Sequence, residues 1–150
     1  MRKLTSLFIM LFIGNIAFAQ DIDKDKQAIK EVIQTAYVEG LQNEGDLAKI
    51  DLGIHPGFVL LGIGKEEEMW TLPIDKWKAK TELKLKEGKL PRTEKPVTVK
   101  FLNIDVTGTA AMAKIEFYVG EKLTFIDYIS LYKFEGYWKM VNKIFYKLPA

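Results

Sequence analysis

Four segments in the C-terminal third of the chain alternate apolar and polar residues, and this pattern restricts the possible folds more than any other feature. The segments span residues 97–106, 110–119, 122–134 and 138–148. Residue pairs typical of tight turns separate them: Thr107-Gly108, Gly120-Glu121 and Glu135-Gly136. The pattern predicts an antiparallel meander of four long strands. One face of such a sheet should pack on helices, and the other should face solvent or a partner.

The residues ahead of the meander are predicted to supply the helices. Residues 23–38 carry apolar side chains at three- and four-residue spacing, which indicates an amphipathic helix that Gly40 and residues 43–45 loosen or end. Asp46 can cap a second, short helix that turns Leu47, Ile50 and Ile54 inward. The sequence His55-Pro56-Gly57 is expected to stop that helix, because proline disfavours helical geometry at the residue before it.

A hairpin and a third helix are expected between these helices and the meander. Residues 58–63 and 66–72 are the predicted hairpin strands, joined by a turn at Gly62 and Gly64. Pro73 suits the first turn of a helix that ends at Gly88. Helices, hairpin and meander together predict a single α+β domain.

The first 19 residues have the pattern of a cleaved export signal. Arg2 and Lys3 precede an apolar core at residues 7–13, and Ala17-Phe18-Ala19 forms a small-x-small cleavage site. A membrane anchor is the alternative, but the apolar stretch is short and interrupted by polar residues. We therefore predict a signal peptide at 1–19, a domain at 20–150, and a periplasmic or secreted location without membrane attachment after cleavage.

Composition excludes some kinds of partner and site. Cleavage removes two of the 22 basic residues and leaves 20, which equals the number of acidic residues. The resulting net charge of zero does not indicate a nucleic-acid partner. Lysines are dense between residues 76 and 100, which we interpret as a solvated helix face and loop. The chain has no cysteine and one histidine, which excludes the usual zinc sites.

The element order and several short motifs resemble the nuclear transport factor 2-like superfamily, and most closely its small secreted, putative lumazine-binding or polyketide-cyclase-like members. The motifs are residues 37–40, Gly45-Asp46, residues 55–58, residues 125–133 and residues 136–145. The resemblance implies a curved mixed sheet wrapped around the N-terminal helix, as in cystatin-like folds, forming a cone with an open pocket. It further implies a small hydrophobic or aromatic ligand, no cofactor and no metal, and a homodimer paired through the outer sheet face.

Asp127 and His55 are the candidate catalytic residues. Asp127 lies in an apolar strand and shares a face with Phe125, Ile129 and Leu131 by alternation. Burial of its carboxylate would favour the protonated form and suit it to proton abstraction; alternatively, it is a structural carboxylate paired with a lysine. His55 could act as a general base at neutral pH or serve only packing.

Five further residues are candidate ligand contacts. They are Tyr37, Trp70, Trp77, Asn142 and Lys143. Aromatic rings offer surface for flat ligands, and the alternative is that they form an ordinary core. Asn142 and Lys143 occupy opposite faces of the last strand, so one of them must point inward; Lys143 would then meet an acidic ligand or Asp127, or else be an exposed sheet lysine.

Three functions remain compatible with these patterns. The first is a small-molecule-binding domain with an apolar, aromatic pocket. The second is a cofactor-free isomerase, cyclase or dehydratase that uses Asp127, with His55 or Tyr37, for proton transfer. The third is a non-catalytic, dimeric interaction module.

Overall fold

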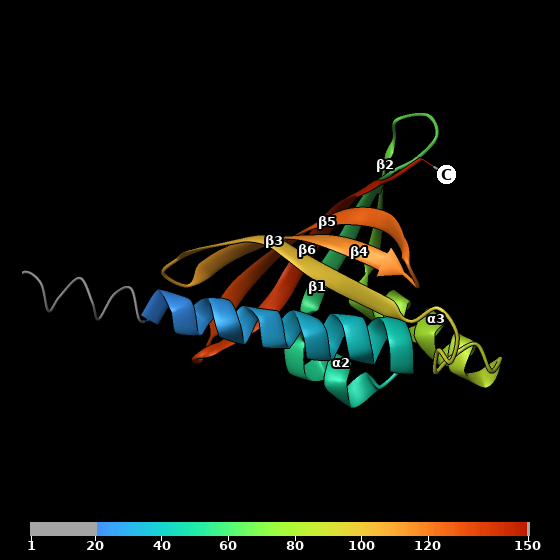
Figure 1. Ribbon diagram of the computed structural model, residues 1–150, viewed down its shortest axis with the longest axis horizontal. Helices are drawn as coiled ribbons and strands as arrows, with labels where there is room; N and C mark the ends of the chain where they lie inside the picture. The colour runs from blue at the N-terminus through green and yellow to red at the C-terminus, as the bar shows by residue number, and fades with distance from the viewer. Residues whose placement is uncertain (1–20, 150) are drawn as a thin grey trace, which may run out of the picture.

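The computed structural model describes residues 21–149, so the predicted signal peptide lies outside the described residues. A long N-terminal helix runs beneath a curved sheet, and two shorter helices flank its C-terminal half (Figure 1). The helical elements after residue 32 are η1 (Ile33–Glu44), α2 (Leu47–Gly53) and α3 (Ile74–Lys86). The strands are β1 (Ile54–Ile63), β2 (Met69–Pro73), β3 (Val97–Thr107), β4 (Ala110–Val119), β5 (Lys122–Phe134) and β6 (Tyr137–Lys147).

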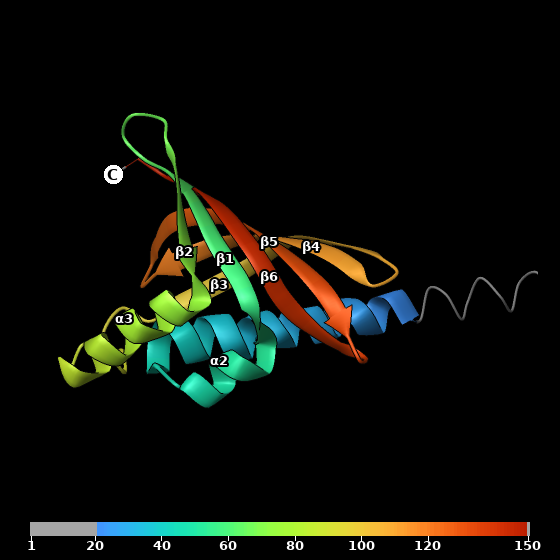
Figure 2. The same ribbon diagram turned by 180° about the vertical axis from the view of Figure 1, so that it is seen from behind.

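The six strands form one mixed sheet with the order β2-β1-β6-β5-β4-β3. β3 to β6 are the predicted antiparallel meander, and each strand pairs with the next. The β1–β2 hairpin joins the meander edge because β1 pairs in parallel with β6 (Figure 2). The α+β class and the curved, mixed sheet around an N-terminal helix are thus confirmed.

The N-terminal helix is longer than the sequence predicts. It is α-helical over residues 21–32 and continues as η1, with the wider π-helical turn, to Glu44. Gly40 lies inside it, because α2 crosses there: a Cβ on Gly40 would lie 3.0 Å from Lys49 Cβ. Gly45 ends the helix in a left-handed conformation, with φ of 76°.

The cap at Asp46 is confirmed, whereas the end of α2 differs from the prediction. The Asp46 carboxylate accepts hydrogen bonds from the backbone N–H groups of Ala48 and Lys49. The helix ends at Gly53, ahead of His55, and β1 begins at Ile54 rather than at residue 58. Ile54 pairs with Met140 of β6, and pairing resumes at Val59 after an irregular stretch that contains Pro56.

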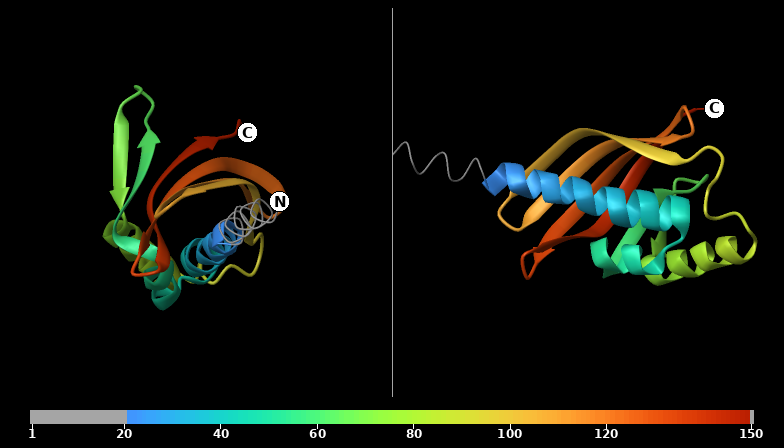
Figure 3. Two further views of the ribbon diagram at one scale, coloured as in Figure 1. Left: turned by 90° about the vertical axis from the view of Figure 1, so that its left-hand side faces the viewer. Right: turned by 60° about the horizontal axis from the view of Figure 1, so that its bottom comes forward.

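The core lies between the N-terminal helix and the concave face of the sheet. Figure 3 shows the sheet arching around this helix, which lies in the hollow of the arch. The sheet buries Ile115, Ile129 and Met140 against Ile33 and the adjacent turns of the helix. The same concave face, farther along the strands, forms the site described next.

Candidate functional site

A cavity of about 230 Å³ lies between η1, α3 and the concave face of β4, β5 and β6. Arg92, in the loop between α3 and β3, also lines it. Its lining side chains come from every layer of the fold: Tyr37, Gln42, Leu60, Trp77, Lys84, Arg92, Phe117, Val119, Phe125, Lys143 and Phe145.

Five aromatic rings form one continuous wall of this cavity. The Tyr37 ring centroid lies 6.2 Å from that of Trp77 and 5.8 Å from that of Phe117. Phe125 continues the wall, with ring centroids 5.5 Å from Phe117 and 5.4 Å from Phe145. Most of these contacts are edge-to-face, the geometry in which the positive ring edge meets the negative ring face.

A buried polar triad, Tyr37–Asp127–Lys143, lies beneath the wall. The Tyr37 hydroxyl donates a hydrogen bond of 2.8 Å to Asp127 Oδ2, and Lys143 Nζ lies 2.8 Å from Asp127 Oδ1. All three residues are at most 4% exposed. Asp127 faces Phe145 across the β5–β6 ladder, and Lys143 faces Ile129, which places both side chains on the concave side.

The environment of the triad favours the neutral form of the Tyr37 phenol and disfavours the charged form of the Lys143 amine. Burial raises the pKa of Tyr37 well above its ordinary value, and the Asp127 charge adds to that shift. Burial lowers the pKa of Lys143, although the charge of Asp127 opposes this effect. Lys143 Nζ also lies 5.1 Å from the ring centroids of both Tyr37 and Phe145, so aromatic faces partly replace water around it.

The contact between Asp127 Oδ1 and Lys143 is an ion pair rather than a well-aligned hydrogen bond. Among the described residues no donor approaches Oδ1 at a favourable hydrogen-bonding angle. Distance alone still makes the pair strong, because the two charges are close and shielded from water. The carboxylate is therefore held in place by charge at one oxygen and by the phenol at the other.

Arg92 is fixed at the mouth of the cavity by backbone contacts. Its Nε donates a 2.8 Å hydrogen bond to the carbonyl of Gln42, and its own N–H donates to the carbonyl of Asn43. The Asn43 amide bonds both the N–H and the carbonyl of Val97 at the start of β3. The end of η1 thus fastens the loop that carries Arg92.

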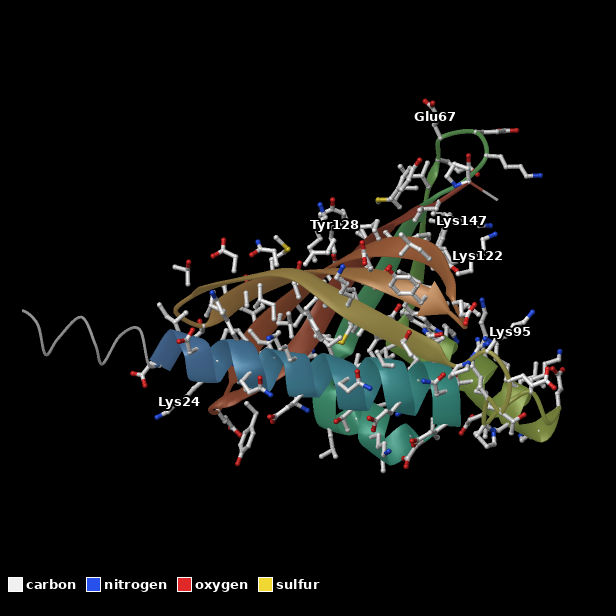
Figure 4. The ribbon with its side chains drawn as sticks, viewed as in Figure 1. Lys24, Glu67, Lys95, Lys122, Tyr128 and Lys147 are labelled. Carbon is white, nitrogen blue, oxygen red and sulfur yellow. The ribbon has the colours of Figure 1, made fainter. Side chains whose placement is uncertain are left out.

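A larger hollow of about 410 Å³ lies at the other end of the helix. Lys24 lines this hollow, whereas Lys95 marks the α3 end of the molecule, and Figure 4 shows the two at opposite ends. Two acidic residues line the hollow, Asp25 and Glu31. Asp25 is already bound by Lys133 at 2.6 Å and by the indole N–H of Trp138 at 2.9 Å, and Glu31 accepts a hydrogen bond from Gln27. Because both acidic groups already have partners within the chain, the aromatic cavity is the better candidate site.

The sequence of the chain also matches a known protein family. The sequence pattern of the family described as "Putative lumazine-binding" matches residues 24–146. The chain belongs to this putative lumazine-binding family. No curated protein matches the chain.

Solved structures of NTF2-like proteins share the fold of this chain. An NTF2-like protein of unknown function from Shewanella baltica OS155 is 24% identical, with a TM-score of 0.65 over 85% of this chain and 96% of that one. Another, from Silicibacter pomeroyi DSS-3, is 20% identical, with a TM-score of 0.67 over 85% and 98%. A putative dehydratase of the NTF2-like family from Streptomyces avermitilis is 14% identical, with a TM-score of 0.55 over 85% and 99%.

Three of the predicted ligand contacts meet at the cavity. Tyr37, Trp77 and Lys143 line it, and Asp127 lies directly behind Tyr37 and Lys143. The predicted strand face of Asp127 is confirmed, and of the two neighbours on β6 it is Lys143 that points inward. Asn142 instead donates a hydrogen bond to the Val59 carbonyl of the next strand.

Neither Trp70 nor His55 lines this cavity, although the Trp70 ring centroid lies 6.0 Å from that of the lining residue Phe145. Trp70 is 38% exposed on β2, and its indole covers Gly62. His55 stacks on Phe134, with ring centroids 4.6 Å apart, and its Nδ1 accepts the Gly57 N–H. Phe134 is seven residues from Asp127 along β5, roughly 23 Å of strand. The fold does not bring His55 and Asp127 together as a dyad.

Several lining residues did not figure among the sequence candidates. Phe117, Phe125 and Phe145 were part of the strand pattern, and the alternation that placed Asp127 could have included Phe125. Arg92 offered a different signal, because every other basic residue after Lys3 is a lysine. Lys84 belongs to the lysine-dense segment that we interpreted as a solvated face.

The arrangement is suited to holding a molecule against rings, with polar groups at its base and mouth. Asp127 is fully buried and does not line the cavity, so a ligand would meet Tyr37 and Lys143 first. No cluster of three potential metal ligands occurs within residues 21–149. Over the same residues, no helix is long and apolar enough to cross a membrane.

Proposed function

We propose that this protein is an exported binding protein for a small aromatic or apolar molecule, which it holds in the cavity between η1, α3 and the sheet. The observation that carries the proposal is the continuous wall of five rings around a space of about 230 Å³. All five rings line this space, and a flat ligand bound there would contact aromatic surface.

The size of the cavity limits the ligand. Small-molecule pockets commonly span about 300–1,000 Å³, and this one is slightly below that range. Its volume corresponds to about eight water molecules at roughly 30 Å³ each. A compound of one or two fused rings fits these dimensions, whereas a sterol-sized molecule does not fit unless the walls move.

Binding is better supported than proton-transfer catalysis. A catalytic base must reach the proton that it removes, within about 2.6–3.2 Å. Asp127 is 0% exposed and is separated from the cavity by the groups that it holds. Acid–base chemistry would therefore have to run through the Tyr37 hydroxyl or the Lys143 amine. The isomerase, cyclase or dehydratase alternative predicts turnover that Tyr37→Phe abolishes.

Intrinsic fluorescence tests the binding proposal. Trp77 lines the cavity, Trp138 is 2% exposed in the core and Trp70 lies on β2. Bicyclic aromatic compounds should quench the wild-type emission saturably, and a Trp77→Phe variant should lose that response. A matched Trp70→Phe variant should keep it. Quenching that survives Trp77→Phe and disappears with Trp70→Phe would place the ligand outside this cavity.

Export makes a separate prediction about the mature chain. The proposal rests on the charged, apolar and small-x-small regions of residues 1–19. The intact mass of the protein from its own host should correspond to a chain that begins at Gln20. If the folded protein from its own host has the mass of the full 150-residue chain, the signal is not cleaved and this prediction is wrong.

We also infer that two copies pair through the convex face of the sheet. Cross-strand pairs there are apolar: Ile126 opposite Tyr146, and Tyr128 opposite Ile144. Tyr128 points away from the N-terminal helix (Figure 4), and Ile144 and Tyr146 are 49% and 60% exposed. Light scattering should give twice the mass of one chain, and Ile144→Glu should give a monomer. A monomeric wild-type protein at micromolar concentration contradicts this pairing.

A further inference from the structure

We infer that the ligand is an anion, most simply an aromatic carboxylate, whose negative group binds Arg92 at the cavity mouth. The inference rests on the proposed binding function and adds the charge of the ligand and the residue that recognises it. Three observations carry it: the signs of the lining charges, the way Arg92 is held, and the charge of the surrounding chain segment.

All charged side chains that line the cavity are cationic. They are Lys84, Arg92 and Lys143, and no aspartate or glutamate lines it. Lys143 is already neutralised by Asp127 at 2.8 Å. Neither Lys84 nor Arg92 forms an ion pair within the described part of the chain. Two positive charges therefore face the cavity without a counter-charge, and an anionic group would supply it.

The guanidinium of Arg92 is oriented in a way that suits a carboxylate. Its Nε is bound to the Gln42 carbonyl, which fixes the plane of the group and leaves the two terminal nitrogens for another acceptor. A carboxylate can accept two parallel hydrogen bonds from such a fork, which a lysine cannot offer. This accounts for an arginine at position 92, where every other Lys or Arg position after Lys3 is a lysine.

The chain segment around the mouth is strongly basic. Residues 76–100 contain eight lysines and Arg92 against three glutamates, whereas residues 20–150 as a whole are neutral. Most of this segment forms α3 and the loop that closes the cavity. A region of one sign next to an opening attracts ligands of the opposite sign and raises their local concentration. The lysine-rich segment would thus attract an anionic ligand to the cavity, in addition to forming a solvated helix face.

The test compares probes that share the naphthalene ring and differ in the charge of its substituent. The probes are 2-naphthoate, the neutral 2-naphthamide and the cationic 2-naphthylmethylammonium ion, measured by calorimetric titration into the wild-type protein. Naphthoate should bind about ten- to a hundredfold more tightly than the amide, as expected for charge-assisted hydrogen bonds. The cation should bind more weakly than the amide, and raising the salt concentration should weaken naphthoate selectively.

Variants of Arg92 and Lys84 test whether these two residues cause the preference for naphthoate. Arg92→Gln should remove most of the preference for naphthoate, and Arg92→Lys should retain only part of it because the fork is lost. Lys84→Gln should lower the preference for naphthoate as well. This variant keeps the loop contacts of Arg92, so it remains informative if Arg92→Gln disturbs the fold. Lys80→Gln removes an exposed lysine from the same helix but outside the lining, and it should leave the preference unchanged.

The outcomes separate this inference from the proposed function. Equal affinity for naphthoate and naphthamide overturns the anion inference while the binding function stands. A preference that survives both Arg92→Gln and Lys84→Gln also overturns it. Failure of all three probes to bind at millimolar concentration contradicts the binding function itself.

Discussion

Asp127 and Lys143 lie on neighbouring strands, with carboxylate oxygen and ammonium nitrogen 2.8 Å apart and both side chains at most 4% exposed. Such a pair is costly to remove from water, so each charge depends on the other to remain in the interior. The pair lies at the base of the aromatic cavity and fixes the polar floor on which the proposed ligand would rest.

Loss of either partner should therefore destabilise the fold strongly. Asp127→Leu or Lys143→Met leaves an uncompensated buried charge and should lower the free energy of unfolding by about 3–5 kcal/mol. The double variant removes both charges and should recover at least half of that loss. Urea denaturation of all four proteins measures the coupling. Strictly additive losses would show that the two groups do not depend on each other.

The Tyr37 hydroxyl should contribute separately. Tyr37→Phe removes the donor to Asp127 Oδ2 while keeping the ring in the wall. Because hydrogen bonds to charged groups contribute about 1.5–3 kcal/mol, the free energy of unfolding should fall by that amount. Tyr132→Phe, on an exposed ring, is the matched control and should change little. Similar effects of the two variants would contradict a stabilising role for the buried bond.

Alkaline titration should distinguish Tyr37 from the exposed tyrosines. Its pKa is raised by burial and by the Asp127 charge, so the folded protein keeps a proton there that the unfolded chain has released. The stabilising contribution is complete below about pH 10, the pKa of a free phenol, and declines as the pH rises toward the folded value. The gap in stability between wild type and Tyr37→Phe should therefore narrow above pH 10.

The stability contribution of Lys143 has the opposite pH dependence and changes at lower pH, so the comparison needs its own control. Its lowered pKa makes its contribution complete above the unfolded value and weaker as the pH falls through the folded value. Pairwise comparison of wild type with Tyr37→Phe cancels this term. A gap that stays constant or widens from pH 9 to 11 would contradict the raised pKa of Tyr37.

The crossing of α2 over the N-terminal helix should be sensitive to one methyl group. A Cβ on Gly53 would lie 2.5 Å from Ala36 Cβ, closer than packed carbon atoms approach. Gly53→Ala should therefore lower the free energy of unfolding by about 1–3 kcal/mol through overpacking. Ala36→Gly in the same chain removes the facing methyl and should recover part of the loss. A neutral Gly53→Ala would show that the two helices can separate freely.

The sheet could be predicted closely from sequence, because the alternation in β4 and β5 is regular and turn residues delimit both strands. Asp127 followed from the same alternation. The helix end at Glu44 could not be predicted, because Gly40 serves the crossing of α2 rather than ending the helix. The start of β1 at Ile54 depends equally on pairing with a strand 86 residues later, at Met140.

The site was harder to predict than the fold. Alternation places Lys143 on one of two faces, but only the register with β5 shows that it meets Asp127. Arg92 reaches the cavity because Asn43 ties the end of η1 to Val97, 54 residues along the chain. Such a contact leaves no periodic trace in the sequence.

Native mass spectrometry with a cavity-filling variant shows whether the aromatic cavity holds a small molecule. Val119→Trp places a large ring in the lined space, while the triad and the mouth residues remain. The wild-type protein, purified from its own host or mixed with 2-naphthoate, should carry one additional small mass per chain, and Val119→Trp should carry none. An adduct that persists equally in folded Val119→Trp would show that the small molecule binds outside this cavity.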